Sequence, residues 1–372
     1  MKDVMGIINI VEAEGLLKGI TFFRPVASVP FGGRYRVIDF VLSSMVNSGM
    51  HNVGVFTRNK YRSVMNHLRS GKEWDLDRKR DGLFVFPPED INATINSLKG
   101  DLQNIHINLN YIHRSSQRYV LITGGNIICN IDYRKAFQHH LETKADITVI
   151  CKEPDDSIRE YSQYTMLETR EDGRVIDMKV SPDKLATGKV SLDMYIVEKS
   201  FLLEVMDACV SRGYYDLVRD GFIRNIGMLN MQSYDYQGYW AKIYSINSYY
   251  RYSMDLLRPE ISHQLFFKPG LIYTKVKDEA PVKYSGNANV INSIVANGCI
   301  IDGTVENSIL FRGVKIRKGA HVKDSILMQK TEIGENACVE NLITDKMVTI
   351  TSGNRLIGVK NYPMVIDLET VI

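Results

Sequence analysis

Residues 305–353 read VENSILFRGVKIRKGAHVKDSILMQKTEIGENACVENLITDKMVTITSG and repeat with a period of 17. Aliphatic residues recur in three columns of this repeat, namely Val305, Val322 and Val339; Ile309, Ile326 and Ile343; Ile316, Ile333 and Ile350. Residues that tolerate a left-handed backbone, such as Asn307, Asp324 and Asn341, recur at its turns. Three coils with one inward aliphatic side chain on each of three sides predict a triangular parallel β-helix. Three columns in register disfavour an antiparallel β-sandwich.

The first 240 or so residues show a different pattern, in which short apolar runs alternate with helix-like segments. This alternation predicts a layered α/β domain. The predicted strands are Val4–Ile10, Val53–Thr57, Tyr119–Thr123 and Ile147–Cys151. The predicted helices are 39–47, 102–113, 133–143 and 244–254, the last leading into a connector near Arg258-Pro259-Glu260.

Length and composition narrow the function classes. The chain has 372 residues, enough for two domains, and a 44% hydrophobic fraction that can form a packed interior. A net charge of +3, with acids and bases mixed, disfavours a nucleic-acid partner. No apolar stretch approaches the ~20 residues of a membrane helix. Five cysteines, an odd number with no metal-ligand spacing, indicate a reduced, cytoplasmic location.

One motif carries a specific resemblance. Residues 29–40 read VPFGGRYRVIDF, and they are followed by Asn47-Ser48-Gly49 and later by Gly238-Tyr239-Trp240. This set resembles the bacterial ADP-glucose pyrophosphorylase (glucose-1-phosphate adenylyltransferase) family over nearly the whole chain. The resemblance implies a nucleotidyltransferase-like, Rossmann-like mixed-sheet α/β domain over 1–245, a connector over 246–280 and a left-handed parallel β-helix over 281–372.

The family joins ATP to glucose 1-phosphate, and this chemistry needs a glycine-rich phosphate loop, basic side chains and carboxylates that hold Mg²⁺. The resemblance maps these needs onto positions that cannot meet them: Leu16 and Val26 replace an arginine and a lysine, Gly125 and Lys242 replace two metal-binding aspartates, and Ser181 replaces a sugar-phosphate lysine. Glu12 and Glu14 stand where the polyanionic nucleotide would dock, so like charges would repel there.

The resemblance therefore implies a non-catalytic, D-type modulatory subunit that assembles with the catalytic C-type subunit, in a heterotetramer, and tunes it in glycogen synthesis. No cofactor is expected in this chain, and Mg²⁺ only in the catalytic partner. Two rival readings remain. One is an active adenylyltransferase with altered metal ligation through Glu12, Glu14 or Asp132. The other is a hexapeptide acyltransferase using His321, disfavoured because few coils are expected.

Anion regulation is a further expectation. Members of the family bind sugar-phosphate or nucleotide effectors between the N-terminal region and the β-helix. Arg34 and Arg36 match basic positions of the N-terminal motif, and Lys315 stands where the family often carries an arginine. Guanidinium groups suit phosphate because they donate two parallel hydrogen bonds. The competing reading is that these are solvated surface charges.

Overall fold

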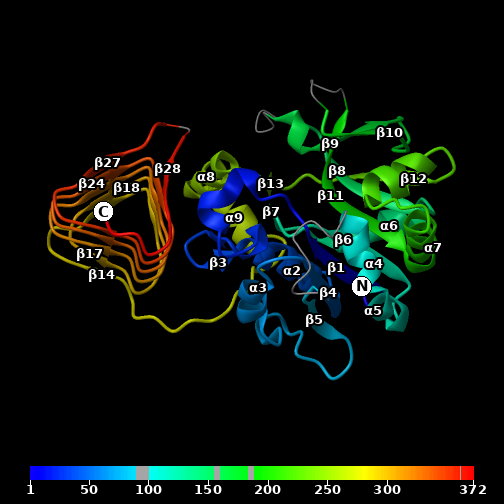
Figure 1. Ribbon diagram of the computed structural model, residues 1–372, viewed down its shortest axis with the longest axis horizontal. Helices are drawn as coiled ribbons and strands as arrows, with labels where there is room; N and C mark the ends of the chain where they lie inside the picture. Colours follow the sequence, from blue (N-terminus) through cyan, green and yellow to red (C-terminus); the bar gives the residue numbers. More distant parts are fainter. Residues whose placement is uncertain (89–99, 155–159, 183–187, 361) are drawn as a thin grey trace.

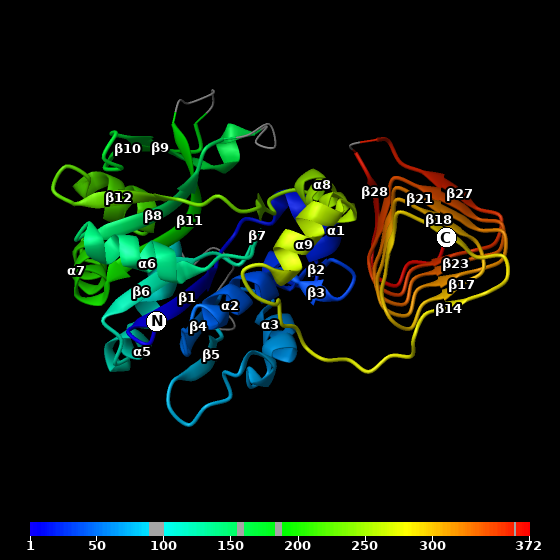
Figure 2. The same ribbon diagram turned by 180° about the vertical axis from the view of Figure 1, so that it is seen from behind.

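The computed structural model describes residues 1–88, 100–154, 160–182, 188–360 and 362–372. An α/β domain and a triangular β-helix lie side by side, with a helical layer between them (Figures 1 and 2). A long connector after residue 267 leads from this layer to the first coil of the β-helix. Among the described residues, every helix is too short or too polar to cross a lipid bilayer.

The α/β domain is built on a mixed sheet, which has nine strands in the described residues. Its main path runs β10-β9-β11-β6-β1-β4-β5, and β8 joins β11 to β12. Pairs β1–β4, β1–β6 and β4–β5 are parallel, whereas β11 is antiparallel to β6 and β8. The strands are β1 (Val4–Ile10), β4 (Asn52–Thr57), β5 (Gly82–Phe86), β6 (Tyr119–Thr123), β8 (Ile147–Lys152), β9 (Thr165–Thr169), β10 (Val175–Val180), β11 (Lys189–Glu198) and β12 (Met231–Asp235).

All four predicted strands are confirmed, because their apolar side chains are buried on both faces of the sheet. Two smaller strand pairs stand beside this sheet, β2 (Pro30–Phe31) with β3 (Tyr35–Arg36) and β7 (Ile127–Cys129) with β13 (Trp240–Lys242). The helices are α1 (Lys18–Thr21), α2 (Val37–Asn47), α3 (Tyr61–Leu68), α4 (Asp101–Ile107), α5 (Leu109–Arg114), α6 (Tyr133–Glu142), α7 (Lys199–Val210), α8 (Ile246–Met254) and α9 (Pro259–Phe267).

Two helix predictions need correction. The single helix predicted over 102–113 is divided into α4 and α5 at Asn108, whose side-chain amide donates to the carbonyl of Asn104 at 2.9 Å and so competes with the helical ladder. The connector near residue 259 contains α9. This helix begins at Pro259 because the fixed φ of proline suits the first helical position, where no N–H is needed.

The C-terminal region is the left-handed parallel β-helix that the sequence predicts. Its described residues form three five-stranded parallel sheets. The first sheet contains β14 (Lys283–Tyr284), β17 (Ile300–Ile301), β20 (Lys315–Ile316), β23 (Glu332–Ile333) and β26 (Thr349–Ile350). The second contains β15 (Asn289–Ile291), β18 (Thr304–Glu306), β21 (His321–Lys323), β24 (Cys338–Glu340) and β27 (Arg355–Ile357). The third contains β16 (Ile294–Val295), β19 (Ile309–Leu310), β22 (Ile326–Leu327), β25 (Leu342–Thr344) and β28 (Met364–Ile366).

The predicted columns are confirmed in their register, since Val305 pairs with Val322 and Ile309 with Ile326 in adjacent parallel strands. The prediction that every column faces inward is wrong for Ile309, Ile326 and Ile343, which pack in the core shared with the α/β domain, whereas their strand neighbours Leu310, Leu327 and Leu342 line the solenoid interior. The expected number of coils was wrong. An earlier coil precedes the 17-residue repeats with a spacing of only 15 residues, as the pairing of Val290 with Val305 shows, and a last coil follows them. The number of coils therefore does not exclude a hexapeptide acyltransferase.

The two domains share one apolar core. Residues from the third solenoid sheet, such as Ile309 and Ile326, pack with Phe31 of β2 and Tyr249 of α8. A buried ion pair crosses the same junction, because Arg24 Nη2 lies 2.8 and 2.7 Å from the two carboxylate oxygens of Asp345. The domains are therefore joined by packing and by a buried charge pair.

Candidate functional site

A cavity of about 180 Å³ opens at the carboxyl ends of β1 and β6, the edge where α/β sheets commonly bind ligands. Its lining comes from β1 and the loop after it, from β6 and the turn after it, from β11 and from β13. The lining residues are Asn9, Val11, Glu12, Asp101, Ile122, Thr123, Gly124, Asn126, Asp193, Tyr195, Leu217, Val218 and Lys242. Two positions that the sequence singles out, Glu12 and Lys242, thus meet in one cavity.

Glu12 turns back over the glycine pair that follows β6. Its Oε1 atom accepts a hydrogen bond from the backbone N–H of Gly125, and its Oε2 atom is buried without a hydrogen-bond partner among the described residues. Burial raises the pKa of Glu12 to about 7, because the carboxylate loses water that a single N–H does not replace. The backbone N–H that could have faced a phosphate is therefore occupied by the chain's own carboxyl group.

Lys242 makes an internal ion pair on the opposite wall. Its Nζ atom lies 2.5 Å from Asp193 Oδ2 and also donates to the carbonyl of Gln163 at 2.9 Å. Asp193 sits at a bulge of β11 with a φ of +54°, a left-handed conformation that non-glycine residues adopt at a cost. The aspartate side chain is thus held in a strained place, where it neutralises the lysine.

Gly125 leaves no room for the carboxylate that the family carries at this position. A Cβ atom at Gly125 would lie 2.9 Å from Ala27 Cβ and 3.1 Å from Ile10 Cγ1, both closer than ordinary van der Waals contact. The same atom would lie 3.5 Å from Glu12 Oε1. A single substitution at residue 125 therefore cannot rebuild the acidic site without moving its neighbours.

Asp101 closes the far end of the cavity. Its Oδ1 atom accepts hydrogen bonds from the backbone N–H groups of Leu102 at 2.7 Å and Leu217 at 2.9 Å. Burial raises the pKa of Asp101 to about 6. Since Leu217 begins a short π-helix (Leu217–Phe222), the bond from its N–H to Asp101 fastens that segment at this end of the cavity.

The other predicted positions lie outside the cavity. Leu16 is exposed, whereas Val26 is buried in the core shared by the two domains. Ser181 follows β10, and its N–H donates to the carbonyl of Tyr164 at 2.9 Å. The carboxylates considered as alternative metal ligands are also engaged, because Glu14 pairs with Lys60, and Asp132 caps α6 and pairs with Arg134 at 2.8 Å.

The residues in this cavity do not fit Mg²⁺. The ion prefers several oxygen ligands with a net negative charge. Here Lys242 stands at one of the two family ligand positions and already neutralises Asp193, while burial raises the pKa of Glu12 to about 7 and so makes its carboxylate a weaker metal ligand. A divalent cation would have to displace an ammonium group from its own counterion.

A second group of charges gathers at the junction of the two domains. Burial, together with Arg24 and Arg36, lowers the pKa of Lys346 to about 7, and burial next to Arg312 and Arg36 lowers the pKa of Lys277. Burial beside Arg34 likewise lowers the pKa of Arg312. These side chains form the junction cluster, namely Arg34, Arg36, Lys277, Arg312 and Lys346.

The structure divides the three predicted effector residues. Arg34 is exposed, with its guanidinium 5.2 Å from the ring centroid of Tyr35, and Arg36 is half-buried, with Nη1 donating to the carbonyl of Ser63 at 2.9 Å. Lys315 lies in β20 of the first solenoid sheet, whereas it is the third sheet that packs against the α/β domain, and Lys315 pairs with Glu332 at 3.5 Å. Sequence reasoning missed Lys277, Arg312 and Lys346, because a connector and the corners of two coils bring them together only in the fold.

Sequence reasoning also missed Asp193. Its only sequence signal was an aspartate within a run of strand residues, a place where aspartate is uncommon. Its pairing with Lys242 joins residues 49 positions apart, so no local pattern could reveal it.

Comparisons with known proteins add the following likenesses. The nucleotidyl transferase family model matches residues 16–258, and the GlmU-like C-terminal hexapeptide model matches residues 280–362. The glycogen biosynthesis protein GlgD of Bacillus subtilis (strain 168) is 36% identical over 364 residues, covering 98% of this chain and 95% of that protein. GlgD of Geobacillus stearothermophilus is 41% identical over 322 residues, covering 86% and 82%. The glucose-1-phosphate adenylyltransferase of Bacillus mycoides (strain KBAB4) is 33% identical over 344 residues, covering 91% and 90%.

Proposed function

Because the chain belongs to the nucleotidyl transferase family that includes GlgD proteins and glucose-1-phosphate adenylyltransferases, we propose that it serves glycogen biosynthesis as a modulatory subunit without adenylyltransferase chemistry of its own. It assembles with a catalytic glucose-1-phosphate adenylyltransferase subunit, in a heterotetramer, and tunes the rate at which that subunit makes ADP-glucose. We place it in the cytoplasm, in line with its five unpaired cysteines.

One observation carries the proposal. In the cavity that holds Glu12 and Lys242, both of these side chains are engaged within the chain, since Lys242 pairs with Asp193 and Glu12 accepts a hydrogen bond from the N–H of Gly125. A nucleoside triphosphate would have to displace a buried carboxyl group, and the residues of the cavity do not fit a metal ion that would screen its charge. When residues that act together in catalysis are all replaced, the enzyme loses nearly all of its rate enhancement.

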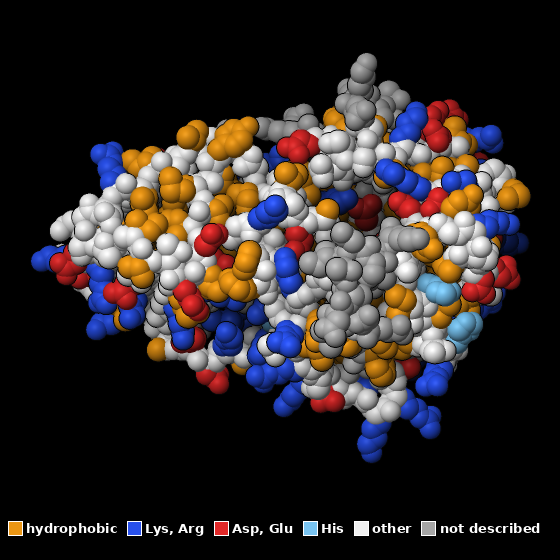
Figure 3. Space-filling view, viewed as in Figure 1, with side chains coloured by type: hydrophobic (Ala, Val, Ile, Leu, Met, Phe, Trp, Pro, Cys, Tyr) orange, Lys and Arg blue, Asp and Glu red, His pale blue; other side chains and the backbone are white. Residues whose placement is uncertain are grey.

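The fold supports a role in assembly. The last strands of two solenoid sheets, β27 and β28, end the coil stack and leave one edge of each strand without a neighbouring strand among the described residues. Hydrophobic side chains gather on this part of the solenoid (Figure 3). They include Ile357, Val359, Tyr362 and Met364, each at least 41% exposed. Unpaired strand edges with apolar neighbours favour contact with another chain.

The direct test is a mixing experiment. The chain is purified together with, and separately from, a catalytic glucose-1-phosphate adenylyltransferase subunit, and pyrophosphate release is measured for the catalytic subunit with and without it. The proposal predicts co-elution and a changed rate or substrate dependence in the mixture. Separate elution with an unchanged rate contradicts it.

The rival of an active enzyme with altered metal ligation is less well supported. It needs free carboxylates near the cavity, but Glu14 pairs with Lys60 and Asp132 with Arg134. Glu12 does line the cavity, but it accepts a hydrogen bond from the N–H of Gly125 and burial raises its pKa, which weakens it as a metal ligand. A hexapeptide acyltransferase is also less well supported, because the relatives at 33–41% identity are GlgD proteins and a glucose-1-phosphate adenylyltransferase. Its candidate residue, His321, lies 3.6 Å from Glu306 on the second solenoid sheet.

The junction cluster favours a second role, the binding of an anionic effector. Burial, and after it the neighbouring cations, lowers the pKa values of Lys277, Arg312 and Lys346, so a bound anion would relieve repulsion as well as form charge-assisted hydrogen bonds. A sugar phosphate or a nucleotide fits this description. Lys277→Ala and Arg312→Ala should each weaken stabilisation of the chain by such anions in a thermal-shift titration. Lys315→Ala, on another sheet, is the matched control, and equal effects of all three variants would refute the cluster as the site.

A further inference from the structure

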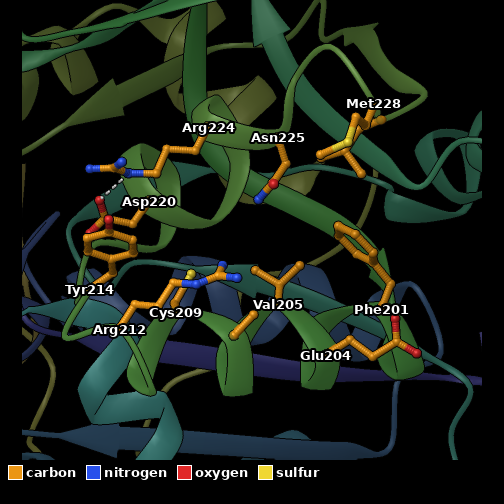
Figure 4. Close-up of a pocket in the computed structure, with 12 residues that line it drawn as sticks. Phe201, Glu204, Val205, Cys209, Arg212, Tyr214, Asp220, Arg224, Asn225 and Met228 are labelled. Atoms are coloured by element: carbon orange, nitrogen blue, oxygen red, sulfur yellow. Dashed lines mark hydrogen bonds and ion pairs between the residues drawn. The ribbon is translucent and has the colours of Figure 1, made fainter.

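A groove of about 270 Å³ lies on the α/β domain, between α7 and the segment that follows it. In Figure 1 this part of the chain is at the side of the molecule opposite the β-helix. Figure 4 shows the groove with α7 along one wall and residues 220–229 along the other. None of these residues belongs to the cavity at the ends of β1 and β6 or to the junction cluster.

The groove is apolar and uncovered. Val205, Cys209 and Leu229 form a buried floor, and Phe201 closes one end. At that end Met228 stands at the rim with 81% of its surface exposed, the largest exposed fraction of any large hydrophobic side chain in the described residues. An apolar groove with such an exposed rim residue is typical of a contact surface.

The charges around the groove differ in whether they have partners. Arg224 pairs with Asp220 at 3.1 Å and stacks 4.2 Å from the ring centroid of Tyr214, so this end is neutralised. Glu204 and Arg212 are both exposed, and neither has an ion-pair partner among the described residues. Figure 4 shows the Arg212 side chain reaching into the groove toward Val205.

The spacing of these two charges is self-complementary. Glu204, Ala208 and Arg212 follow one another at intervals of four residues, so they share one face of α7 and the turn after it. Two copies of α7 that cross antiparallel at Ala208 bring Glu204 of each copy opposite Arg212 of the other. Alanine at the crossing point allows close approach, and the symmetric contact is the kind that two-fold dimers use.

We propose that this groove takes α7 of a second copy of the same chain, in a two-fold contact that covers Met228 and pairs Glu204 with Arg212. A small organic anion fits the observations less well, since it would satisfy Arg212 but leave Glu204 unpaired and Met228 exposed. The inference goes beyond the proposed function, because it concerns the contact between two copies of this chain.

The first test is a charge swap followed by sedimentation velocity of the full chain over a concentration series. Arg212→Glu and Glu204→Arg should each weaken self-association about tenfold or more, because each places like charges face to face twice per dimer. The double swap should return the dissociation constant to within about threefold of the wild type. Asp207→Arg, an exposed change on another face of α7, is the control and should have no effect.

A monomeric wild type, or reversals that leave self-association unchanged, would overturn the proposal. Loss of co-elution with the catalytic subunit in Arg212→Glu, with self-association intact, would assign the groove to that partner and also overturn it. The proposed function fails by a different readout, an unchanged rate of the catalytic subunit in the mixing experiment, so the two failures are distinguishable.

The second test is disulfide trapping in a Cys338→Ser background, which removes the one cysteine that is not buried. Two-fold related residues at Ala208 should lie close enough for a disulfide, which needs Cα atoms within about 7 Å. Ala208→Cys should therefore give a covalent dimer under mild oxidation. Ser200→Cys lies eight residues away, which puts its two copies roughly 24 Å apart, and it should remain monomeric. Equal cross-linking of the two variants contradicts the crossing geometry.

Discussion

The buried pair between Arg24 and Asp345 gives a sharp test of how the two domains are joined. Both side chains are about 95% buried, and both carboxylate oxygens accept from Arg24 Nη2. Asp345→Asn removes the counterion and leaves the guanidinium buried between the domains. Breaking a buried pair in this way typically costs about 3–5 kcal/mol, since the remaining charge has neither water nor a partner.

A double variant separates the pair's own contribution from the cost of stranding one charge. Arg24→Met combined with Asp345→Leu removes both charges and fills the space with apolar groups of similar size, so most of the stability should return, to within about 1–2 kcal/mol of the wild type. Glu340→Gln, which removes a half-exposed pair with Lys323 at 4.0 Å, is the control and should cost less than about 1 kcal/mol.

The assay is urea unfolding at pH 7, followed by tryptophan fluorescence and by circular dichroism. Trp74 and Trp240 report on the α/β domain, and the circular dichroism of the strands includes the solenoid. If Asp345→Asn costs less than about 1 kcal/mol, or if the double variant is no more stable than the single one, the pair does not hold the junction as described.

Three other outcomes follow from the cavity. Glu12→Gln keeps the acceptor for the N–H of Gly125. Because the pKa of Glu12 in the folded chain, about 7, exceeds its ordinary value of 4.5, the wild type loses stability as the pH rises between these two values. In thermal unfolding the variant should therefore be more stable than the wild type by up to about 3 kcal/mol at pH 8 and equally stable below pH 4, with the exposed change Glu171→Gln as the control. A pH-independent difference would refute this. Gly125→Asp should lower stability by about 1–3 kcal/mol through its clash with Ala27, and a tolerated substitution would contradict that geometry. Lys242→Met should cost about 1–2 kcal/mol by leaving Asp193 unpaired, and no loss in urea unfolding would show that the pair is not formed.

The regular parts of the fold could be predicted because they repeat a local pattern. The 17-residue columns place Val322 and Val339 inside the solenoid, and the apolar run Val4–Ile10 forms a strand with the predicted bounds. The column of Ile309 and Ile326 has the predicted register but faces the α/β domain, which the period alone does not reveal. In both cases burial of every member of a periodic set decides the structure. The three coils counted from the 17-residue period are too few, because the earlier coil has a spacing of 15 residues and lies outside that period.

The site could be predicted only as a set of missing groups. The sequence indicates which residues cannot bind a nucleotide or a metal, but it does not reveal what takes their place. Asp193 of β11 meets Lys242 of β13, and Asp101 of α4 binds the N–H of Leu217 in the segment after α7, because the fold brings each pair of elements together. Such pairings depend on the packing of distant elements and leave no local pattern.

The most direct measurement is pyrophosphate release by the isolated chain with ATP, glucose 1-phosphate and Mg²⁺, at a chain concentration high enough to detect a rate a thousandfold below that of the catalytic subunit. With Glu12 over the glycine turn and Lys242 paired to Asp193, we expect no release above a blank without the chain. Release at a rate comparable to that of the catalytic subunit assayed alone would contradict the account.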